Sequence, residues 1–127
     1  MTIAIGTDIV EIDRIESIFQ RQGDKLAQRI LTAQELQRLN ALTQTRAQVA
    51  YLAKRWCAKE AIAKALGTGI AQGVGFQQMD IDRDELGAPV VTLSGAALAR
   101  LHVLGAQRVL LSLSDERHYA VAFCSLV

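Results

Sequence analysis

Hydrophobic and polar residues alternate at the start of the chain, as they do in a β-strand. Over residues 2–10, Ile3, Ile5 and Ile9 share one parity, whereas Asp8 has the other. Successive side chains of a strand point to opposite faces. The alternation therefore predicts a strand with the isoleucines on one face and a single carboxylate on the other.

A helical pattern follows in the first half of the chain. Residues 46–66 contain no Gly or Pro and are rich in Ala, Leu, Lys and Arg, which favour helices. Gly67 comes directly after them, and glycine is the usual residue just past the end of a helix. Two earlier helix starts are predicted by the spacing of a capping box: Asp13 with Glu16, and Thr32 with Glu35.

Beyond residue 66, glycines and short apolar segments replace the helical pattern. Strands are predicted over residues 76–82, 90–93, 108–114 and 119–126, with turns at 85–89 and 115–118. Ser94 is placed to cap a short helix that ends at Gly105. The predicted order is β-α-α-α-β-β-α-β-β. Because hairpins dominate the second half, we expect an α+β fold with a mainly antiparallel sheet packed on helices.

The size and composition of the chain narrow the options. A length of 127 residues suits one domain, so residues 1–127 are predicted to form a single domain. So short a chain leaves little room for a deep cleft, which favours an active site at a boundary between subunits. No apolar run approaches the ~20 residues of a membrane span, and the N-terminus lacks the features of a signal peptide. A cytoplasmic protein is expected.

Charge and cysteine content exclude some classes of function. The net charge of +1 argues against binding to nucleic acid by bulk electrostatics. From Arg14 to Lys64, however, there are ten Lys or Arg residues and four acids. This basic half indicates an acidic partner or a phosphorylated ligand, unless it is an ordinary solvated surface. Cys57 and Cys124 lack zinc-site spacing and are expected to be reduced core residues.

Two groups of residues are candidates for chemistry. Asp8 lies in an apolar strand, where a carboxylate is costly unless a metal, an arginine or solvent compensates it. Glu60 and Lys64 are four residues apart and share a helical face with Trp56, either as an ordinary surface pair or as part of a site. Residues 67–69 follow, and their glycines can bring backbone N–H groups close to phosphate oxygens.

The surrounding sequence bears on which ligand these residues could bind. Neither GxGxxG nor GxxxxGK[ST] occurs, so Rossmann-type and P-loop nucleotide binding are poorly supported. Two carboxylates, neighbouring cations and a glycine loop instead suit Mg²⁺, which combines carboxylates and waters with the phosphates of a substrate. The sequence therefore favours a metal-assisted site for a phosphorylated ligand.

Three segments carry a more specific signal: residues 6–14 (GTDIVEIDR), 55–69 (RWCAKEAIAKALGTG) and 112–120 (SLSDERHYA). Together, and in this order, they resemble the signatures of the holo-acyl carrier protein synthases, in the short class of 4′-phosphopantetheinyl transferases. Cys57 and Leu31 depart from the residues usual in that family, and neither position carries a proposed catalytic group.

The resemblance implies a reaction and an assembly. The 4′-phosphopantetheine group would pass from coenzyme A to a serine of apo-acyl carrier protein, with Mg²⁺ as cofactor and 3′,5′-ADP as the second product, as in fatty acid biosynthesis. The chain would form a homotrimer with active sites between subunits. Asp8 and Glu60 would bind the metal, Glu60 would act as general base and Lys64 would stabilise the leaving phosphate.

The resemblance also implies residues that bind the two substrates. The residues implied for coenzyme A are Arg55, Lys64, Gly67, Thr68, Gly69 and His118. The residues implied for the acidic carrier protein are Arg14, Arg21 and Arg29.

Other functions remain open at this point. The same chemistry could act on a polyketide or peptide-synthetase carrier. A non-catalytic module that binds a carrier or a nucleotide could share the fold, although such a module would be expected to lack Asp8, Glu60 or Lys64. Nucleic-acid binding by the basic half lacks interleaved aromatic residues and a recognition motif.

Overall fold

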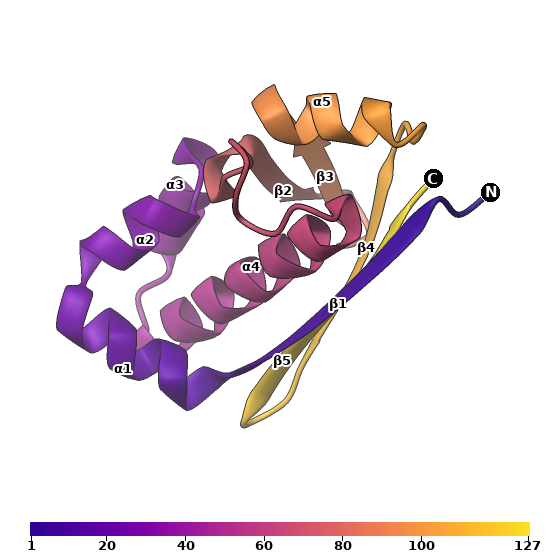
Figure 1. Ribbon diagram of the computed structural model, residues 1–127. Coiled ribbons are helices and arrows are strands. Elements are labelled where there is room, and N and C mark those ends of the chain that lie inside the picture. Colours follow the sequence, from indigo (N-terminus) through magenta and orange to yellow (C-terminus); the bar gives the residue numbers. More distant parts are fainter.

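A long helix, α4 (Thr45–Leu66), runs through the centre of the fold, with a sheet on one side and shorter helices on the other (Figure 1). The computed structural model describes residues 1–127 in full. The other elements, in chain order, are β1 (Ala4–Glu11), α1 (Ile12–Gln22), α2 (Asp24–Ile30), α3 (Ala33–Ala41), the 3₁₀ turn η1 (Phe76–Gln78), β2 (Met79–Arg83), β3 (Pro89–Leu93), α5 (Gly95–Val103), β4 (Val109–Asp115) and β5 (Tyr119–Leu126).

The strands form two antiparallel sheets. In the larger sheet the order is β1-β5-β4, whereas β2 and β3 form a separate hairpin. Helix α4 packs on one face of the larger sheet, and it also contacts α1, α2 and α3. The predicted α+β class, with antiparallel strands packed on helices, is confirmed. None of the helices combines the length and the apolar character needed to cross a membrane.

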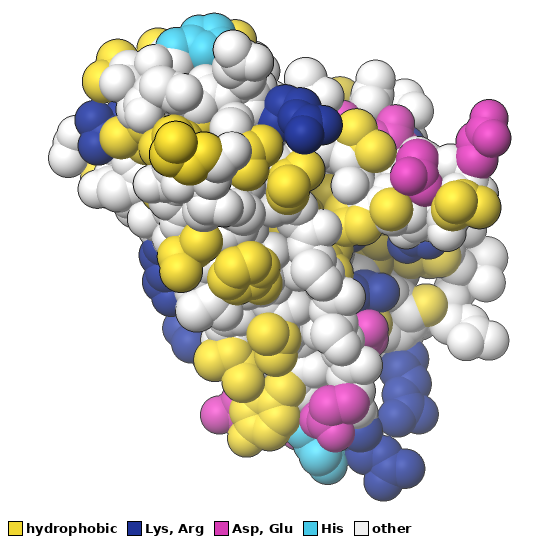
Figure 2. Space-filling model, turned by 90° about the vertical axis from the view of Figure 1, so that its right-hand side faces the viewer, with side chains coloured by type: hydrophobic (Ala, Val, Ile, Leu, Met, Phe, Trp, Pro, Cys, Tyr) yellow, Lys and Arg dark blue, Asp and Glu magenta, His cyan; other side chains and the backbone are white.

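The second face of the larger sheet is apolar and uncovered. Ile5 and Ile9 of β1 are 61% and 62% exposed, and Val121 and Phe123 of β5 are exposed on the same face. Figure 2 looks onto this side of the molecule and shows hydrophobic side chains gathered along it. The isoleucines of β1 therefore point outward, and Asp8 lies on the face that packs against α4.

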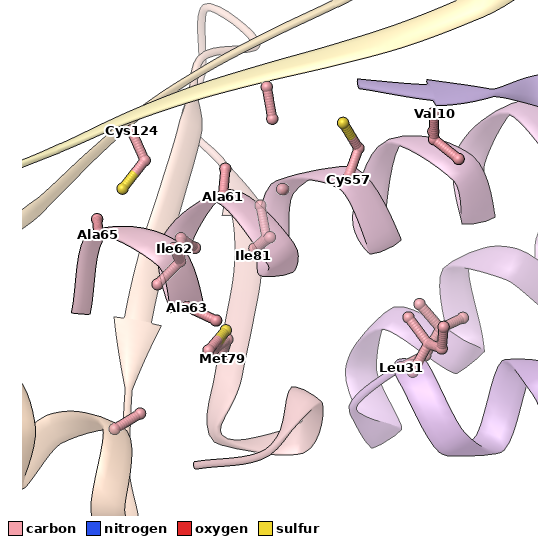
Figure 3. Packing of buried hydrophobic residues seen from close by; sticks show 14 of the residues in the cluster. Val10, Leu31, Cys57, Ala61, Ile62, Ala63, Ala65, Met79, Ile81 and Cys124 are labelled. Atoms are coloured by element: carbon pink, nitrogen blue, oxygen red, sulfur yellow. The ribbon is translucent and has the colours of Figure 1, made fainter. Parts of the chain in front are cut away.

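β1 and α4 approach each other closely at Gly6. A Cβ atom at this position would lie 2.1 Å from the carbonyl oxygen of Ala61 and 2.8 Å from the backbone nitrogen of Ala65. Figure 3 shows Ala61 and Ala65 on the side of α4 that meets the sheet, beside Cys124 of β5. Only a glycine on the strand, facing alanines on the helix, permits this separation, and it brings the backbone of β1 next to the last turns of α4.

Two fully buried charged residues link α4 to the other helices. The ammonium of Lys59 lies 2.5 Å from Oε1 of Glu35 in α3 and donates to the carbonyl oxygen of Ile30 at 2.7 Å. Oε2 of Glu35 accepts a hydrogen bond from the backbone N–H of Ile81 in β2 at 2.9 Å. Burial lowers the pKa of Lys59, and the Glu35 carboxylate opposes this effect. One buried network thus joins α2, α3, α4 and β2.

The N-termini of α1 and α3 are where the two capping boxes were predicted. The capping box of Thr32 and Glu35 is confirmed, because the side chain of each residue accepts a hydrogen bond from the backbone N–H of the other. A helix starts near Asp13 as predicted, at Ile12, but the capping box of Asp13 and Glu16 is wrong, because β1 runs directly into α1 and leaves Asp13 inside the first turn. The helix therefore begins without a side-chain cap.

Two further boundaries differ from the sequence prediction. Gly23 has a φ of 56° and separates α1 from α2, so four helices precede β2 where three were expected. The strand predicted from residue 76 begins at Met79, because Phe76–Gln78 form a 3₁₀ turn. The prediction for the cysteines is confirmed, since Cys57 and Cys124 are both free and buried.

Candidate active site

Asp8 and Lys64 meet where β1 crosses the last turns of α4. The ammonium of Lys64 donates to Oδ1 of Asp8 at 2.9 Å and to the backbone oxygen of Thr7 at 3.0 Å. The side chains of Asp8 and Lys64 are 19% and 54% exposed, respectively. The hydrogen bond that Lys64 donates to Asp8 raises the pKa of Lys64. The carboxylate that the sequence marks as costly is therefore compensated by a lysine cation that stays charged at neutral pH.

Glu60 lies one turn before Lys64 on the same helix. Its Oε1 accepts a hydrogen bond from the indole N–H of Trp56 at 3.3 Å, and its second oxygen has no donor within the protein. Its negative charge also helps to raise the pKa of Lys64. The carboxylates of Glu60 and Asp8 thus come from two packed elements and share Lys64 as a neighbouring cation.

The glycine loop (residues 67–69) ends α4 beside Lys64. Gly67 has a φ of 80°, in the left-handed region that glycine tolerates, and its N–H donates to the carbonyl oxygen of Lys64 at 3.0 Å. Arg100 of α5 donates to the carbonyl oxygen of Leu66 at 2.8 Å and so satisfies one acceptor at the end of the helix. The three residues predicted for this part of the site all lie in the loop: Gly67, Thr68 and Gly69.

Cys57 of α4 contacts the backbone of Asp8, and the sequence did not suggest this contact. Its sulfur lies 3.2 Å from the backbone oxygen of Asp8 and 3.5 Å from that of Ala120. Burial raises the pKa of Cys57 to about 12, so the thiol stays protonated and donates rather than acting as a nucleophile. The contact joins residues 49 positions apart, and no local pattern marks it.

The oxygen atoms at this site suit a hard divalent cation. Asp8 and Glu60 offer carboxylates, and Mg²⁺ commonly takes one or two carboxylates together with waters and substrate phosphates. No group of three or more His, Cys, Asp or Glu side chains that could hold a metal ion occurs in the chain. A bound Mg²⁺ would therefore complete its coordination with water and with the phosphates of a ligand.

Comparison with protein families shows which family the chain matches. The family model described as the 4′-phosphopantetheinyl transferase superfamily matches residues 4–124, from the start of β1 almost to the end of β5. The chain belongs to the 4′-phosphopantetheinyl transferase superfamily.

Similar members of the superfamily align over nearly the whole chain. A holo-[acyl-carrier-protein] synthase of Shewanella amazonensis is 55% identical over 120 residues, which is 94% of each chain. The crystal structure of the holo-[acyl-carrier-protein] synthase from Neisseria meningitidis has a TM-score of 0.88 at 43% identity, and covers 100% of this chain and 99% of that one. The Bacillus anthracis synthase in complex with CoA (3′,5′-ADP) has a TM-score of 0.82 at 35% identity, and covers 99% and 96%.

Arg55 of this phosphopantetheinyl transferase lies away from the two carboxylates. It is 2% exposed, and its guanidinium carbon lies 4.5 Å from the centre of the Tyr51 ring. Lys59, four residues further along α4, is held in the buried network and is not available to a phosphate at Asp8. Arg55 lines a separate cavity of about 240 Å³ with two other cations, Lys54 and Arg83. A role for Arg55 in coenzyme A binding stays a prediction.

His118 lies at the far end of α4 from the glycine loop. It is exposed in the turn between β4 and β5, and it lines a hollow with Thr45 and Arg46 at the start of the helix. Ala122, the partner of Asp8 in β5, lies four residues from His118, which is about 13 Å along an extended strand. Within one chain, therefore, His118 does not contact Asp8 directly.

The three arginines predicted to contact a carrier protein are all exposed. Arg14 and Arg21 lie on α1, and Arg29 lies on α2. Arg21 donates to the carbonyl oxygen of Ser17 at 3.3 Å, and no acidic side chain pairs with any of the three. They are free to meet an acidic partner, and this contact stays a prediction.

Proposed function

We propose that this chain transfers the 4′-phosphopantetheine group of coenzyme A to a serine of an apo-acyl carrier protein, with Mg²⁺, and so serves fatty acid biosynthesis in the cytoplasm. The observation that carries the proposal is the placement of Asp8, Glu60 and Lys64 at one junction beside a glycine loop. Membership of the superfamily and a coenzyme A-bound structure of a relative support the same assignment.

Glu60 is the proposed general base. Mg²⁺, when held by Asp8 and Glu60, supplies positive charge against the diphosphate of coenzyme A. The serine oxygen forms a bond to the phosphorus that carries the pantetheine arm, and the bond from that phosphorus to the bridging oxygen breaks. The serine proton passes to the carboxylate of Glu60, and 3′,5′-ADP leaves with the electron pair. The indole N–H of Trp56 donates to Oε1 of Glu60 and so orients the base.

Lys64 stabilises the departing phosphate. Asp8 and Thr7 already hold its ammonium in place, and its raised pKa keeps it charged. A cation fixed before the reaction needs little reorganisation when charge develops on the leaving group. The glycine loop, Gly67, Thr68 and Gly69, is the proposed contact for the nucleotide end. The N–H groups of Gly67 and Gly69 donate to the carbonyl oxygens of Lys64 and Ala63, so the N–H of Thr68 is the donor proposed for the ligand.

A homotrimer with active sites between subunits is part of the proposal. The uncovered sheet face, which includes Ile9, Val121 and Phe123, is the kind of apolar surface that a stable interface buries. Joining chains along this face would also allow His118 of one subunit to approach a ligand held at Asp8 of the next. Within one chain, His118 lies four strand residues from Ala122, the β5 partner of Asp8.

The partner is proposed to be an acidic carrier protein that docks on α1 and α2. Arg14, Arg21 and Arg29 are exposed there without acidic partners. Complementary charge of this kind raises the rate of association and weakens with salt.

The proposal is tested by intact-protein mass spectrometry of an apo-acyl carrier protein incubated with the chain, coenzyme A and MgCl₂. We expect a gain of one phosphopantetheine group that EDTA abolishes and excess Mg²⁺ restores. Glu60→Gln should lose most of the activity while staying folded, whereas Glu85→Gln, in an exposed turn, should not. If only polyketide carriers gain the phosphopantetheine group, the assigned substrate changes and the proposed reaction stands. No gain on any apo-carrier would overturn the proposal.

A further inference from the structure

Helix α5 lies against both ends of the segment that connects α4 to η1 (residues 67–75). Figure 1 shows α5 across the end of α4 at which this segment begins. The first three residues of the segment are the glycine loop of the proposed active site. None of the groups assigned to the transfer reaction belongs to α5.

Arg100 of α5 reaches the end of α4. Its Nε donates to the carbonyl oxygen of Leu66 at 2.8 Å, although the two residues are 34 positions apart. Its Nη2 lies 3.4 Å from the position that a Cβ on Gly67 would take, so the guanidinium lies alongside the first residue of the glycine loop. No acidic side chain pairs with Arg100. The last carbonyl groups of a helix lack partners within it, and Arg100 supplies one where the loop begins.

Gln78 of η1 ties the other end of the segment to α5. Its side-chain oxygen accepts a hydrogen bond from the backbone N–H of Ala97 at 2.9 Å, and its amide nitrogen donates to the carbonyl oxygen of Gly73 at 2.8 Å. Gln72 has a φ of 58°, which a residue with a side chain adopts only at a cost. The path of the segment is therefore set by its contacts with α5 at both ends.

The shape of the glycine loop determines where its free donor points. The N–H groups of Gly67 and Gly69 donate back to α4, at 3.0 Å to Lys64 and 3.1 Å to Ala63, and leave the N–H of Thr68 between them for a ligand. A donor that is fixed before the ligand arrives binds it without the cost of ordering the loop. A loop that adopts several shapes binds more weakly, in proportion to the fraction that is competent.

We propose that Arg100 is a positioning residue that holds the glycine loop in the shape that binds the nucleotide end of coenzyme A. The inference rests on the proposed function, and it adds a residue of α5 that acts on the ligand only through the loop. Without Arg100, the carbonyl oxygen of Leu66 loses its partner and the loop is no longer held from α5. Binding of coenzyme A should then weaken, whereas binding of the carrier protein should not.

The first test is amide hydrogen exchange of the full chain without ligand, followed by NMR. Arg100→Leu should speed exchange at Gly67 and Gly69 at least about fivefold and leave exchange within β5 unchanged. Arg108→Leu removes the same charge from an exposed position and should exchange as the wild type does. This measurement requires no transfer activity, and unchanged exchange at Gly67 and Gly69 in Arg100→Leu overturns the inference.

The second test separates positioning from a structural role, by steady-state kinetics well below the Tm. Arg100→Leu should raise the KM for coenzyme A at least about fivefold, with kcat and the KM for the apo-carrier within about twofold of the wild type. Arg100→Lys, whose ammonium can still donate to Leu66, should recover part of the loss. Leu98→Ala removes a side chain of α5 that packs on the core, so it should lower the Tm and leave the KM for coenzyme A unchanged.

Two kinetic outcomes overturn the inference: an unchanged KM for coenzyme A in Arg100→Leu, or an equal rise of this KM in Leu98→Ala. If the wild type transfers nothing, the proposed function fails, and calorimetric titration with 3′,5′-ADP takes the place of the KM. Tighter binding by the wild type than by Arg100→Leu would then support the role of Arg100, and equal affinity would overturn it.

Discussion

The ammonium of Lys64 and the carboxylate of Asp8 lie 2.9 Å apart across the contact between α4 and β1. Both residues belong to the proposed site, and a metal ion bound by Asp8 would share this carboxylate with Lys64. The relationship means that the residues needed for catalysis also hold the helix against the strand.

The first prediction concerns pH. The pKa of Lys64 is raised in the folded state, chiefly by the hydrogen bond that it donates to Asp8. A raised pKa stabilises the fold at pH values below the unfolded pKa of about 10.4, and this stabilisation disappears as the pH rises through the folded pKa. Solvent weakens the effect, because the side chain is more than half exposed. The Tm difference between wild type and Lys64→Met should be constant from pH 6 to 9 and shrink above about pH 10.4. A difference that persists unchanged at higher pH would contradict this assignment.

Gly6→Ala should destabilise the protein by about 3 kcal/mol or more, because the new methyl group meets the backbone of α4 and not a side chain that can move. The Cβ would lie 2.1 Å from the carbonyl oxygen of Ala61. Urea unfolding at fixed protein concentration measures the change. Gly75→Ala is the matched control, since no atom lies within 4 Å of its Cβ position and its φ is −134°. Equal stability of the two variants would show that β1 can move away from α4 at little cost.

Lys59→Met should cost about 3 kcal/mol, because it removes the cation nearest the buried carboxylate of Glu35 and leaves only Arg55, at 4.0 Å. Adding Glu35→Gln should recover part of the loss, since the amide oxygen can still accept the hydrogen bond from Ile81 without a charge. Denaturant unfolding of both variants gives the comparison. If the double variant is less stable than Lys59→Met alone, the charge of Glu35 is not the source of the cost.

Trp56 should report metal binding, because it is the only tryptophan and donates to Glu60. We expect MgCl₂ to change its fluorescence with a saturable dependence, whereas NaCl at equal ionic strength should not. Glu60→Gln should remove the response and Glu85→Gln should keep it. An identical titration for wild type and Glu60→Gln would place the metal elsewhere.

Phe123→Asp should dissociate the proposed trimer, because it puts a charge in the middle of the uncovered sheet face. Phe123 is 47% exposed in the single chain. Sedimentation velocity should give a smaller species for this variant and an unchanged one for Leu86→Asp, which alters an exposed leucine in the β2–β3 turn. A monomeric wild type would remove the basis of an active site between subunits.

Local spacing in the sequence predicts much of this fold. The capping box of Thr32 and Glu35, the helix over residues 46–66 and its end at Gly67 depend on residues within a few positions of one another. The shared face of Glu60 and Lys64 follows from the same helical repeat. Such features need no knowledge of how the elements pack.

Features that depend on packing were not predictable in the same way. The contacts between Gly6 and Ala61, Asp8 and Cys57, and Glu35 and Lys59 each join distant segments. The isoleucines of β1 face outward although their apolar character alone would place them in the core. An uncovered apolar face of this kind is expected where a chain buries it against other subunits.

Lys59 and Glu60 are consecutive, yet one lies in the buried network and the other beside the exposed site. Adjacent helical residues point about 100° apart, so the rotation of α4 determines which of the two is inside. Inserting one residue before Lys59 would turn the last part of the helix by that angle, moving Glu60 to the buried position of Ala61 and Lys59 to the position of Glu60. The length of α4 is therefore fixed by its two different faces.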